Sequence, residues 1–301
     1  MKYLVFDVGG SAIKYSIMTE DAEFIITGKV KIPTDSFENF RETIGSIYDE
    51  YKDDIQGIAM SMPGIIDSDN GYAYTGGFLR YNDKREIVKE LQERCNCDIV
   101  IENDGKAAAL AEVWKGSLKE NTDGIVMILG TGVGGGIIKD RKVHRGKHFM
   151  AGEFSYIQSN ISNPYNMNGF LGFVGSAIGL VSQIAESKGL KSEELDGIQA
   201  FEYIKNNDKD AVEIIDQYTK NLAVQIYNLQ CLFDPEKICI GGGISAQDIL
   251  MEYIIKNVKE YYRNLNLGLP EAEVVRCKFG NDSNQIGALY KMLSKKELVT
   301  N

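Results

Sequence analysis

Two stretches of this chain follow one pattern, in which an apolar strand, a glycine-rich turn and a second apolar strand come in succession. The first pattern covers residues 2–18 and the second covers residues 124–139. The two stretches differ in sequence, so we interpret them as a repeat of architecture. A chain of 301 residues is long enough for two hydrophobic cores of ordinary size or for one large core. The pattern therefore predicts two domains built on one plan.

Segments with strand and helix signals alternate along the rest of the chain. Apolar residues recur at helical spacing from Phe37 to Tyr51, and a long amphipathic helix carries apolar residues from Ile215 to Leu229 on one face. Buried strands are expected at residues 57–62, 98–102 and 237–240, and further helices at residues 87–94, 105–114 and 249–254. Such alternation is typical of an α/β fold with parallel strand pairing.

Three glycine clusters each follow an apolar strand. They are Asp7-Val8-Gly9-Gly10-Ser11, Gly130-Thr131-Gly132-Val133-Gly134-Gly135 and Gly241-Gly242-Gly243. Glycine lets the backbone approach a ligand closely, and the amides of such turns can face a phosphate. One cluster alone is most often an ordinary tight turn. Three clusters at strand ends favour a nucleotide site, in which the third cluster receives a flat purine.

The second glycine cluster also fits the dinucleotide-binding fingerprint. That fingerprint needs a helix directly after the glycines, whereas here residues 136–139 predict a strand. We therefore interpret the cluster as a β-hairpin whose amides face a phosphate. The phosphate loop that ends in Gly-Lys-Ser/Thr and the protein-kinase signatures do not occur in this sequence.

Asp104 follows the apolar run Ile99-Val100-Ile101 and opens the helix-prone stretch after Gly105. A carboxylate at this position feels the positive end of the helix dipole and stays ionised at neutral pH. An ionised carboxylate suits a general base that accepts a proton from a substrate hydroxyl. Together with the glycine turns, Asp104 indicates phosphoryl transfer.

Composition excludes several other classes of protein. The net charge of −10, without a basic run, disfavours nucleic-acid binding. The apolar start is interrupted at Asp7, so we expect neither a signal peptide nor a membrane span. Five scattered cysteines indicate reduced thiols and a cytoplasmic protein. With His144 and His148 as the sole histidines, a Ser-His-Asp hydrolase or a histidine-rich zinc site is poorly supported.

Over nearly its whole length the sequence resembles the ROK family of sugar kinases, within the actin-like, hexokinase and Hsp70 ATPase superfamily. The resemblance rests on two phosphate motifs, residues 7–11 and 129–136, on the sugar and catalytic segment Glu102-Asn103-Asp104, on Ala151-Gly152-Glu153, and on the adenosine motif at residues 240–243. It implies two actin-like (ribonuclease H-like) domains with mixed sheets flanked by helices, and ATP and sugar in the cleft between them. The expected boundaries are 1–115, completed by a C-terminal helix at about 284–301, and 116–283, with a sugar-site loop at 144–176.

The resemblance also implies roles for single residues. Asp104 would take the proton of the sugar 6-hydroxyl as that oxygen attacks the γ-phosphate of ATP, and Asp7 would hold Mg²⁺ through water. Asn103 and Glu153 would bind sugar hydroxyls, with backbone amides at Gly64. The nucleotide would contact Asp7, Gly9, Gly10, Ser11, Gly130, Thr131, Gly132, Gly134, Gly241, Gly242 and Gly243.

The chain departs from the family pattern where many relatives bind zinc. The zinc loop aligns with residues 166–175, which keep the glycines but lack every cysteine, so we expect no zinc, and asparagine hydrogen bonds and packing of Phe173 in its place. Tyr156 replaces a histidine, and Gly175 replaces a glutamate that contacts the sugar near C1. We expect that Gly175 opens space there, with Tyr156, Phe149 or Phe170 as an aromatic platform. This predicts a β-glucoside such as cellobiose as substrate.

Other interpretations stay open at this level. Tyr156 and the phenylalanines could simply fill the core of a loop that lost its metal. The enzyme could be a glucokinase or another free-hexose kinase, although the missing histidine and glutamate weaken this. A sugar-responsive regulator would need a helix-turn-helix ahead of Asp7, where we expect no room. A homodimer is usual in the family.

Overall fold

The computed structural model describes residues 1–300, with side chains described through Lys295, and divides into two compact units. Unit 1 comprises Met1–Trp114, Arg145–Ala151 and the chain from Asp282 onward. Unit 2 comprises Lys115–His144 and Gly152–Asn281. The segment Arg145–Ala151, expected in the second domain, packs with unit 1.

Unit 1 is built on a mixed sheet with the strand order β3-β2-β1-β4-β7. β1 pairs antiparallel with β2, which pairs antiparallel with β3, whereas β1, β4 and β7 run parallel. Alternate residues of β1, namely Leu4, Phe6 and Val8, lie in the core together with the apolar residues of α1. The strands are β1 (Lys2–Val8), β2 (Ala12–Thr19), β3 (Phe24–Lys31), β4 (Ile58–Met62) and β7 (Ile99–Asn103), with a small pair β5 (Ile66–Asp67) and β6 (Tyr72–Ala73) beside them.

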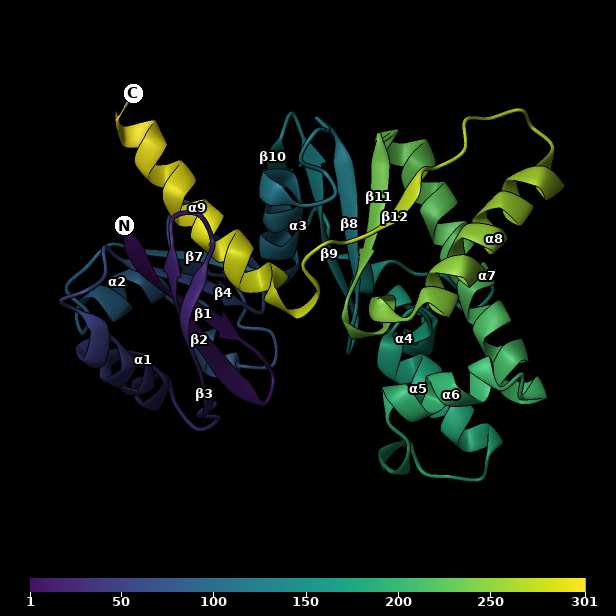
Figure 1. Cartoon of the computed structure of the whole chain (residues 1–301), viewed down its shortest axis with the longest axis horizontal. Coiled ribbons are helices and arrows are strands. Elements are labelled where there is room, and N and C mark those ends of the chain that lie inside the picture. The colour runs from purple at the N-terminus through teal and green to yellow at the C-terminus, as the bar shows by residue number, and fades with distance from the viewer. Residues whose placement is uncertain (301) are drawn as a thin grey trace. The chain divides into compact units, whose positions relative to one another are not determined.

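The helices of unit 1 are α1 (Phe37–Tyr51), α2 (Ile87–Gln92), α3 (Asp104–Lys115) and α9 (Ser283–Thr300). The C-terminal helix α9 packs on β4, β1 and β7 (Figure 1). It also approaches α3 closely, since a Cβ on Gly287 would lie 1.7 Å from the carbonyl oxygen of Ala107. The C-terminal helix that the sequence predicts thus completes unit 1.

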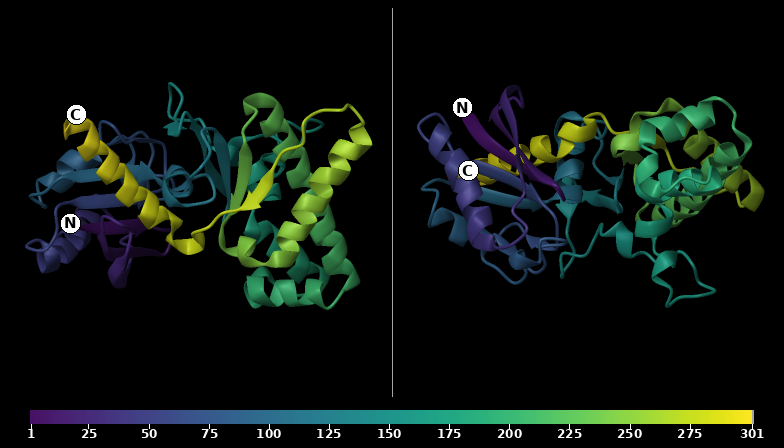
Figure 2. Two further views of the ribbon diagram at one scale, coloured as in Figure 1. Left: turned by 45° about the horizontal axis from the view of Figure 1, so that its top comes forward. Right: turned by 90° about the horizontal axis from the view of Figure 1, so that it is seen from below.

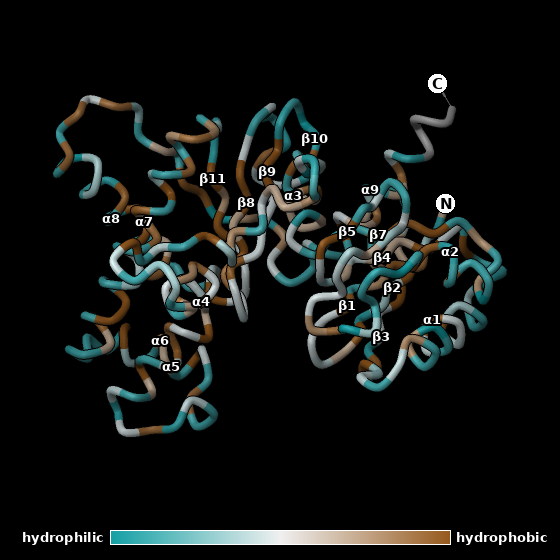
Figure 3. Tube along the Cα trace, turned by 180° about the vertical axis from the view of Figure 1, so that it is seen from behind, coloured by the Kyte–Doolittle hydropathy of each residue, from teal (hydrophilic) through white to brown (hydrophobic). Residues whose placement is uncertain are grey.

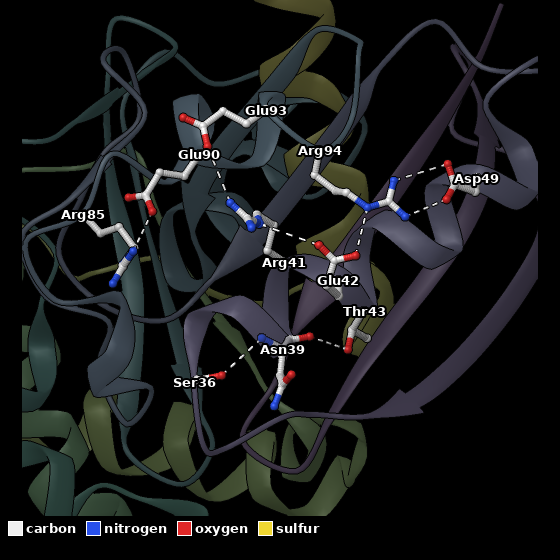
Figure 4. Close-up of polar contacts among 10 residues, drawn as sticks. All are labelled: Ser36, Asn39, Arg41, Glu42, Thr43, Asp49, Arg85, Glu90, Glu93 and Arg94. Carbon is white, nitrogen blue, oxygen red and sulfur yellow. Dashed lines mark hydrogen bonds and ion pairs between the residues drawn. The ribbon is translucent and has the colours of Figure 1, made fainter.

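Charged side chains join α1 to the end of α2 on the surface of unit 1. Arg94 donates to Asp49 at 2.6 Å and to Glu42 at 3.0 Å, and Arg41 lies 3.5 Å from Glu93 (Figure 4). Ser36 caps α1 by accepting a hydrogen bond from the backbone N–H three residues on. These contacts hold α1, along which hydrophilic and hydrophobic residues follow one another (Figure 3), against the rest of the unit.

Unit 2 repeats the plan of unit 1 with the strand order β10-β9-β8-β11-β12. β8 pairs antiparallel with β9, which pairs antiparallel with β10, whereas β8, β11 and β12 run parallel. Each strand of this sheet thus has a counterpart in unit 1. The repeat of architecture that the sequence predicts is confirmed, in the form of mixed sheets. The strands are β8 (Gly124–Leu129), β9 (Val133–Lys139), β10 (Lys142–His144), β11 (Lys237–Gly241) and β12 (Val274–Arg276).

The helices of unit 2 follow the long loop after β10. In both views of Figure 2, the long helices α7 and α8 lie side by side. The helices are α4 (Leu171–Val174), α5 (Ala177–Ser187), α6 (Gly197–Lys205), α7 (Lys209–Phe233) and α8 (Asp248–Leu265), with short 3₁₀ turns at Phe154–Tyr156, Met167–Gly169 and Gly243–Ala246. In the part of the chain that the structure describes, no helix is long and apolar enough to cross a membrane.

Candidate functional site

The first glycine cluster forms the tight turn of the β1–β2 hairpin, as predicted. The turn is closed by a 3.0 Å hydrogen bond from Gly9 N to the oxygen of Ala12. Asp7 precedes it on the face of β1 opposite Leu4, Phe6 and Val8. Its Oδ1 accepts a 2.9 Å hydrogen bond from Asn284 of α9.

Lys14 lies directly across the hairpin from Asp7 in the strand register, and its Nζ is 3.5 Å from Asp7 Oδ2. Lys14 was not among the predicted site residues, although the pairing of the two predicted strands was a signal that could have indicated it. The end of this hairpin therefore combines glycine amides, a carboxylate and a cation.

Asp104 is the first residue of α3, directly after β7, as predicted. Its Oδ1 accepts a 2.8 Å hydrogen bond from Gly105 N. The preceding Asn103 acts as the helix cap, because its Oδ1 accepts from Lys106 N at 3.1 Å. The carboxylate of Asp104 thus lies at the N-terminus of a helix, where negative charge is stabilised.

Asn103 also ties α3 to the turn at Gly64, because its Nδ2 donates to the oxygen of Gly64 at 2.9 Å. Gly64 has φ +107°, and a Cβ there would lie 1.9 Å from the oxygen of Thr75. The fold itself therefore requires glycine at position 64. Asn103 is only 5% exposed, so its main role in the structure is to cap α3 and to fix this turn.

Glu102 is a fully buried carboxylate at the end of β7, and it forms an ion pair with Arg145. Its other oxygen accepts a 3.0 Å hydrogen bond from Asn103 N. A buried charge is tolerated only when it is paired and hydrogen-bonded. The ion pair therefore fastens the segment Arg145–Ala151 to the same strand end that carries Asp104.

The second glycine cluster is a β-hairpin, since β8 and β9 pair antiparallel. This excludes the dinucleotide fingerprint, as the sequence analysis concluded. The turn is closed by a 2.9 Å hydrogen bond from Gly130 N to the oxygen of Gly132. Thr131 at its tip is exposed, and Gly134 already lies within β9.

The third glycine cluster ends β11 and leads through a 3₁₀ turn to α8. Gly242 has φ +93°, and a Cβ there would lie 2.1 Å from the oxygen of Leu129. A Cβ on Gly241 would meet the side chains of Ile128 and Cys277. By contrast, a Cβ on Gly243 would have no protein atom within 4 Å. The fold therefore requires Gly241 and Gly242, whereas Gly243 borders open space.

Gly130 and Gly243 meet at a pocket of about 440 Å³ within unit 2. The starts of α5 and α6 complete it, and the backbone N–H of Ala177 donates to the oxygen of Gly130 at 2.9 Å. Gly130, like Gly243, has no protein atom near an added Cβ. The pocket combines bare backbone with apolar walls and a few polar groups; it is lined by Leu129, Gly130, Ala177, Asp196, Gly197, Ile198, Phe201, Gly243, Ile244 and Gln247.

Glu153 and Tyr156 lie at the two ends of a short turn in unit 2 that follows Gly152. The hydroxyl of Ser155 fixes this turn to the second glycine hairpin, because it accepts from Val133 N at 3.0 Å and donates to Val133 O at 3.1 Å. Glu153 is half-buried, and Tyr156 is 62% exposed. Tyr156 therefore does not fill a core, which was one interpretation left open.

The structure corrects two expectations about the loop at residues 166–175. A Cβ on Gly175 would lie 2.7 Å from Leu171 Cδ1 and 3.1 Å from Val133 Cγ2, so glycine here fits existing packing and opens no space. Phe173 is 52% exposed and does not hold the loop by packing.

Hydrogen bonds hold this loop. The buried hydroxyl of Tyr218 donates to the oxygen of Gly175 at 2.8 Å, and burial raises the pKa of that hydroxyl. Asparagine contributes as expected, since Asn166 Oδ1 accepts from Asn168 N at 3.0 Å. Among the described residues, no three His, Cys, Asp or Glu side chains gather to form a metal site.

Mg²⁺ is the metal that the nucleotide chemistry implies. It keeps several waters and takes phosphate oxygens, so it needs only one or two carboxylates from the protein. The nearly buried carboxylate of Asp7 at the end of a glycine hairpin provides an oxygen donor of this kind. The residues present therefore fit Mg²⁺ bound together with phosphates.

A duplicated mixed sheet with a glycine hairpin in each copy places the chain in the class of actin-like folds. More narrowly, the chain belongs to the ROK family, whose model matches residues 3–295. It is 28% identical over 297 residues to a β-glucoside kinase from Listeria monocytogenes, covering 98% of this chain and 99% of the relative. It is 27% identical over 301 residues to an N-acetyl-D-glucosamine kinase from Vibrio cholerae, covering 96% of this chain and 98% of the relative.

The fold is also that of solved ROK proteins. A ROK family protein from Streptococcus pneumoniae TIGR4, solved in complex with sucrose, superimposes with a TM-score of 0.89 at 24% identity. The match covers 99% of this chain and 100% of that one. The predicted fold class and family are therefore confirmed.

Proposed function

We propose that this protein is an ATP-dependent kinase that phosphorylates the 6-hydroxyl of a glucose unit, with a β-glucoside such as cellobiose as its substrate. The observation that carries the proposal is the pocket that brings Gly130 and Gly243 together. These residues come from two motifs that are far apart in the sequence, and neither is required to be glycine by the fold. A glycine that borders a pocket, at a position where the packing of the protein does not require glycine, allows a ligand to approach the backbone closely.

The nucleotide is assigned to unit 2 and to the first hairpin. The adenosine lies in the pocket against Gly243, between apolar walls, and Asp196 and Gln247 offer polar groups. The phosphates are assigned to the two glycine hairpins, at Gly9, Gly10, Ser11, Gly130, Thr131 and Gly132 of the turns and at Gly134 of β9. The N–H groups of Gly9 and Gly130 already close their own turns, so these two glycines contribute close approach of the backbone. Gly241 and Gly242 are also assigned to the adenosine site, and they shape the end of β11 as well, where an added Cβ would meet neighbouring atoms.

Asp104 is assigned as the general base. It accepts the proton of the sugar 6-hydroxyl while that oxygen attacks the γ-phosphoryl group, whose bond to the β-phosphate oxygen breaks to leave ADP. Phosphoryl transfer depends mostly on positioning and on stabilisation of charge. The start of α3 fixes the carboxylate in place, and Asn103 fixes the start of α3.

Asp7 is assigned to Mg²⁺, through water. Bound with ATP, this ion would neutralise charge on the phosphates. Asn284 orients the carboxylate of Asp7, and Lys14 adds a positive charge at the same hairpin. Asp7 would thus bind the metal ion, and Lys14 would offset phosphate charge, without a cluster of acidic residues.

Glu153, Asn103 and the turn at Gly64 are assigned to sugar hydroxyls, and Tyr156 stays a candidate at the edge of the sugar site. Asn103 has two amide hydrogens and donates one of them to the oxygen of Gly64, so one further hydrogen is left for a sugar hydroxyl. Relatives named β-glucoside kinases, which match nearly the full length of the chain, support a glycoside substrate. A relative named N-acetyl-D-glucosamine kinase favours the alternative of a free hexose or hexosamine. A cytoplasmic location and a homodimer stay predictions.

The test is a substrate panel with MgATP in which ADP release and the ³¹P NMR spectrum of the product are measured. Cellobiose, glucose and N-acetylglucosamine are compared. We expect sugar-dependent ADP release with cellobiose preferred, and a product phosphate that couples to the two hydrogens on C6. No ADP release with any sugar would contradict the kinase assignment. A strong preference for glucose would contradict the glycoside assignment alone.

A further inference from the structure

Three aromatic rings form a row on unit 1. Tyr72 and Tyr74 meet edge to face with ring centroids 5.0 Å apart, and Tyr74 stacks on Phe149 at 5.5 Å with an angle of 28° between the planes. Tyr74 is nevertheless 47% exposed. The exposed part of a ring that its neighbours hold in place offers a rigid apolar surface to a ligand.

The backbone of Phe149 is strained. Its φ is +60°, in the left-handed region where a bulky side chain is a real outlier. This conformation costs roughly 1–2 kcal/mol, and such strain persists only where the surroundings fix it, often at ligand sites. Glycine or asparagine would adopt this backbone more easily, so the strain places the ring against Tyr74 at a cost to stability.

Phe149 is fastened to the strand end that carries Asp104. It lies in the segment Arg145–Ala151, which is closed by a 3.1 Å hydrogen bond from Ala151 N to the oxygen of Arg145. Arg145 forms the ion pair with the buried Glu102. Glu102 lies two residues before Asp104 in the sequence, so the position of the ring is coupled to the proposed base.

Tyr74 is fastened to the same strand end by a separate route. Its backbone N–H donates to the oxygen of Ile65 at 2.9 Å, and Ile65 N donates in turn to Thr75 Oγ1 at 3.0 Å. The neighbouring Gly64 accepts the hydrogen bond from Asn103, the residue directly before Asp104. Two independent sets of contacts thus bring Tyr74 and Phe149 to the end of β7.

We propose that Tyr74 and Phe149 form the binding subsite for the aglycone of the substrate, that is, for the second ring attached at C1 of the glucose unit. The inference rests on the proposed function. It assigns the preference for glycosides to Tyr74 and Phe149, in place of Tyr156 or the space expected at Gly175. The ligand is a pyranose or an aryl ring, whose flat apolar face stacks on Tyr74. Neither ring takes part in the transfer itself.

The test compares kcat/KM for glucose, cellobiose and phenyl β-D-glucoside in the wild type, Tyr74→Leu and Phe149→Asn. Loss of ring stacking is worth about 0.5–1.5 kcal/mol, so kcat/KM for both glucosides falls about two- to twelvefold in each variant, mainly through KM. The value for glucose stays within twofold. Phe149→Asn removes the ring and relaxes the backbone, so its melting temperature is equal to that of the wild type or higher.

Tyr156→Leu is the matched control, because it removes an exposed tyrosine ring from the other candidate platform. It changes kcat/KM for glucose and for the two glucosides by the same factor, so the preference for glucosides is kept. Equal losses on glucose and on glucosides would show that the rings hold the glucose unit or the fold, and would overturn the inference. Unchanged values in both ring variants, or a selective loss in Tyr156→Leu, would overturn it as well. Each of these outcomes contradicts the inference alone, provided that the wild type phosphorylates sugars. If the wild type phosphorylates no sugar, the proposed function is contradicted as well.

Discussion

Two adjacent glycines of the third cluster give opposite predictions when each is replaced by alanine. In Gly242→Ala, the new Cβ would lie 2.1 Å from the oxygen of Leu129 on a backbone with φ +93°. Strain of the left-handed backbone costs roughly 1–2 kcal/mol, and the overpacking adds about 1–3 kcal/mol. In Gly243→Ala, the Cβ meets no protein atom within 4 Å, so the free energy of unfolding is unchanged or rises by up to about 1 kcal/mol.

For nucleotide binding, by contrast, the important substitution is Gly243→Ala. In Gly243→Ala the added methyl group occupies the pocket assigned to adenosine, so we expect the Kd for MgATP to rise about tenfold, equivalent to about 1.4 kcal/mol. Urea denaturation of the ligand-free protein gives the first quantity, and calorimetric titration with a non-hydrolysable ATP analogue gives the second. If Gly243→Ala binds the analogue like the wild type, the pocket is not the nucleotide site. If Gly242→Ala is as stable as the wild type, the packing described here is incorrect.

Three further predictions concern buried or paired groups. Tyr218→Phe leaves the buried oxygen of Gly175 without its donor, which lowers the free energy of unfolding in urea by about 1–3 kcal/mol; an unchanged value would contradict this role. The Lys291 ammonium beside Asp69 lowers the pKa of that carboxyl, so its stabilising effect is complete above the usual carboxyl pKa and is lost as pH falls through the lowered value. The difference in unfolding free energy between wild type and Asp69→Asn should therefore shrink below about pH 4, and a constant difference would argue against it. Burial raises the pKa of Cys95 to about 11, so this thiol is alkylated at pH 8 far more slowly in the native protein than in urea, and equal rates would contradict its burial.

Local pattern was sufficient to predict the parts of the fold that glycine and apolar periodicity determine. Both hairpins were predicted because a strand that ends in glycine and restarts as a strand has few other conformations. The start of α3 at Asp104 followed from the change in periodicity after β7. By contrast, β3 was missed because none of its residues is buried, and its sequence does not alternate regularly between apolar and polar residues.

The composition of the site was less predictable, because it depends on contacts between distant segments. The pocket joins Gly130, Ala177, Gly197 and Gly243, and no local pattern relates these positions. A glycine in a sequence also does not reveal whether its hydrogens face a ligand or a neighbouring side chain. This is why Gly175 was interpreted as open space, whereas Leu171 and Val133 pack against it.

The loop after β10 is a second part of the structure that local sequence could not predict. The expected domain boundaries, 1–115 and 116–283, placed Arg145–Ala151 in the second domain. The buried carboxylate of Glu102 needs a cation, and Arg145 supplies it, so the segment packs with unit 1. An ion pair between residues so far apart has no signature in the sequence alone.

The role of Asp104 is tested most directly by the rate of sugar-dependent ADP release in Asp104→Asn. The amide keeps the shape of the side chain but cannot accept the proton, so we expect kcat to fall by about 10²- to 10⁴-fold while the affinity for the ATP analogue stays within twofold. Asp98→Asn makes the same change just before the start of β7, on an exposed carboxylate, and should keep the wild-type rate. A kcat for Asp104→Asn within twofold of the wild type would contradict the account.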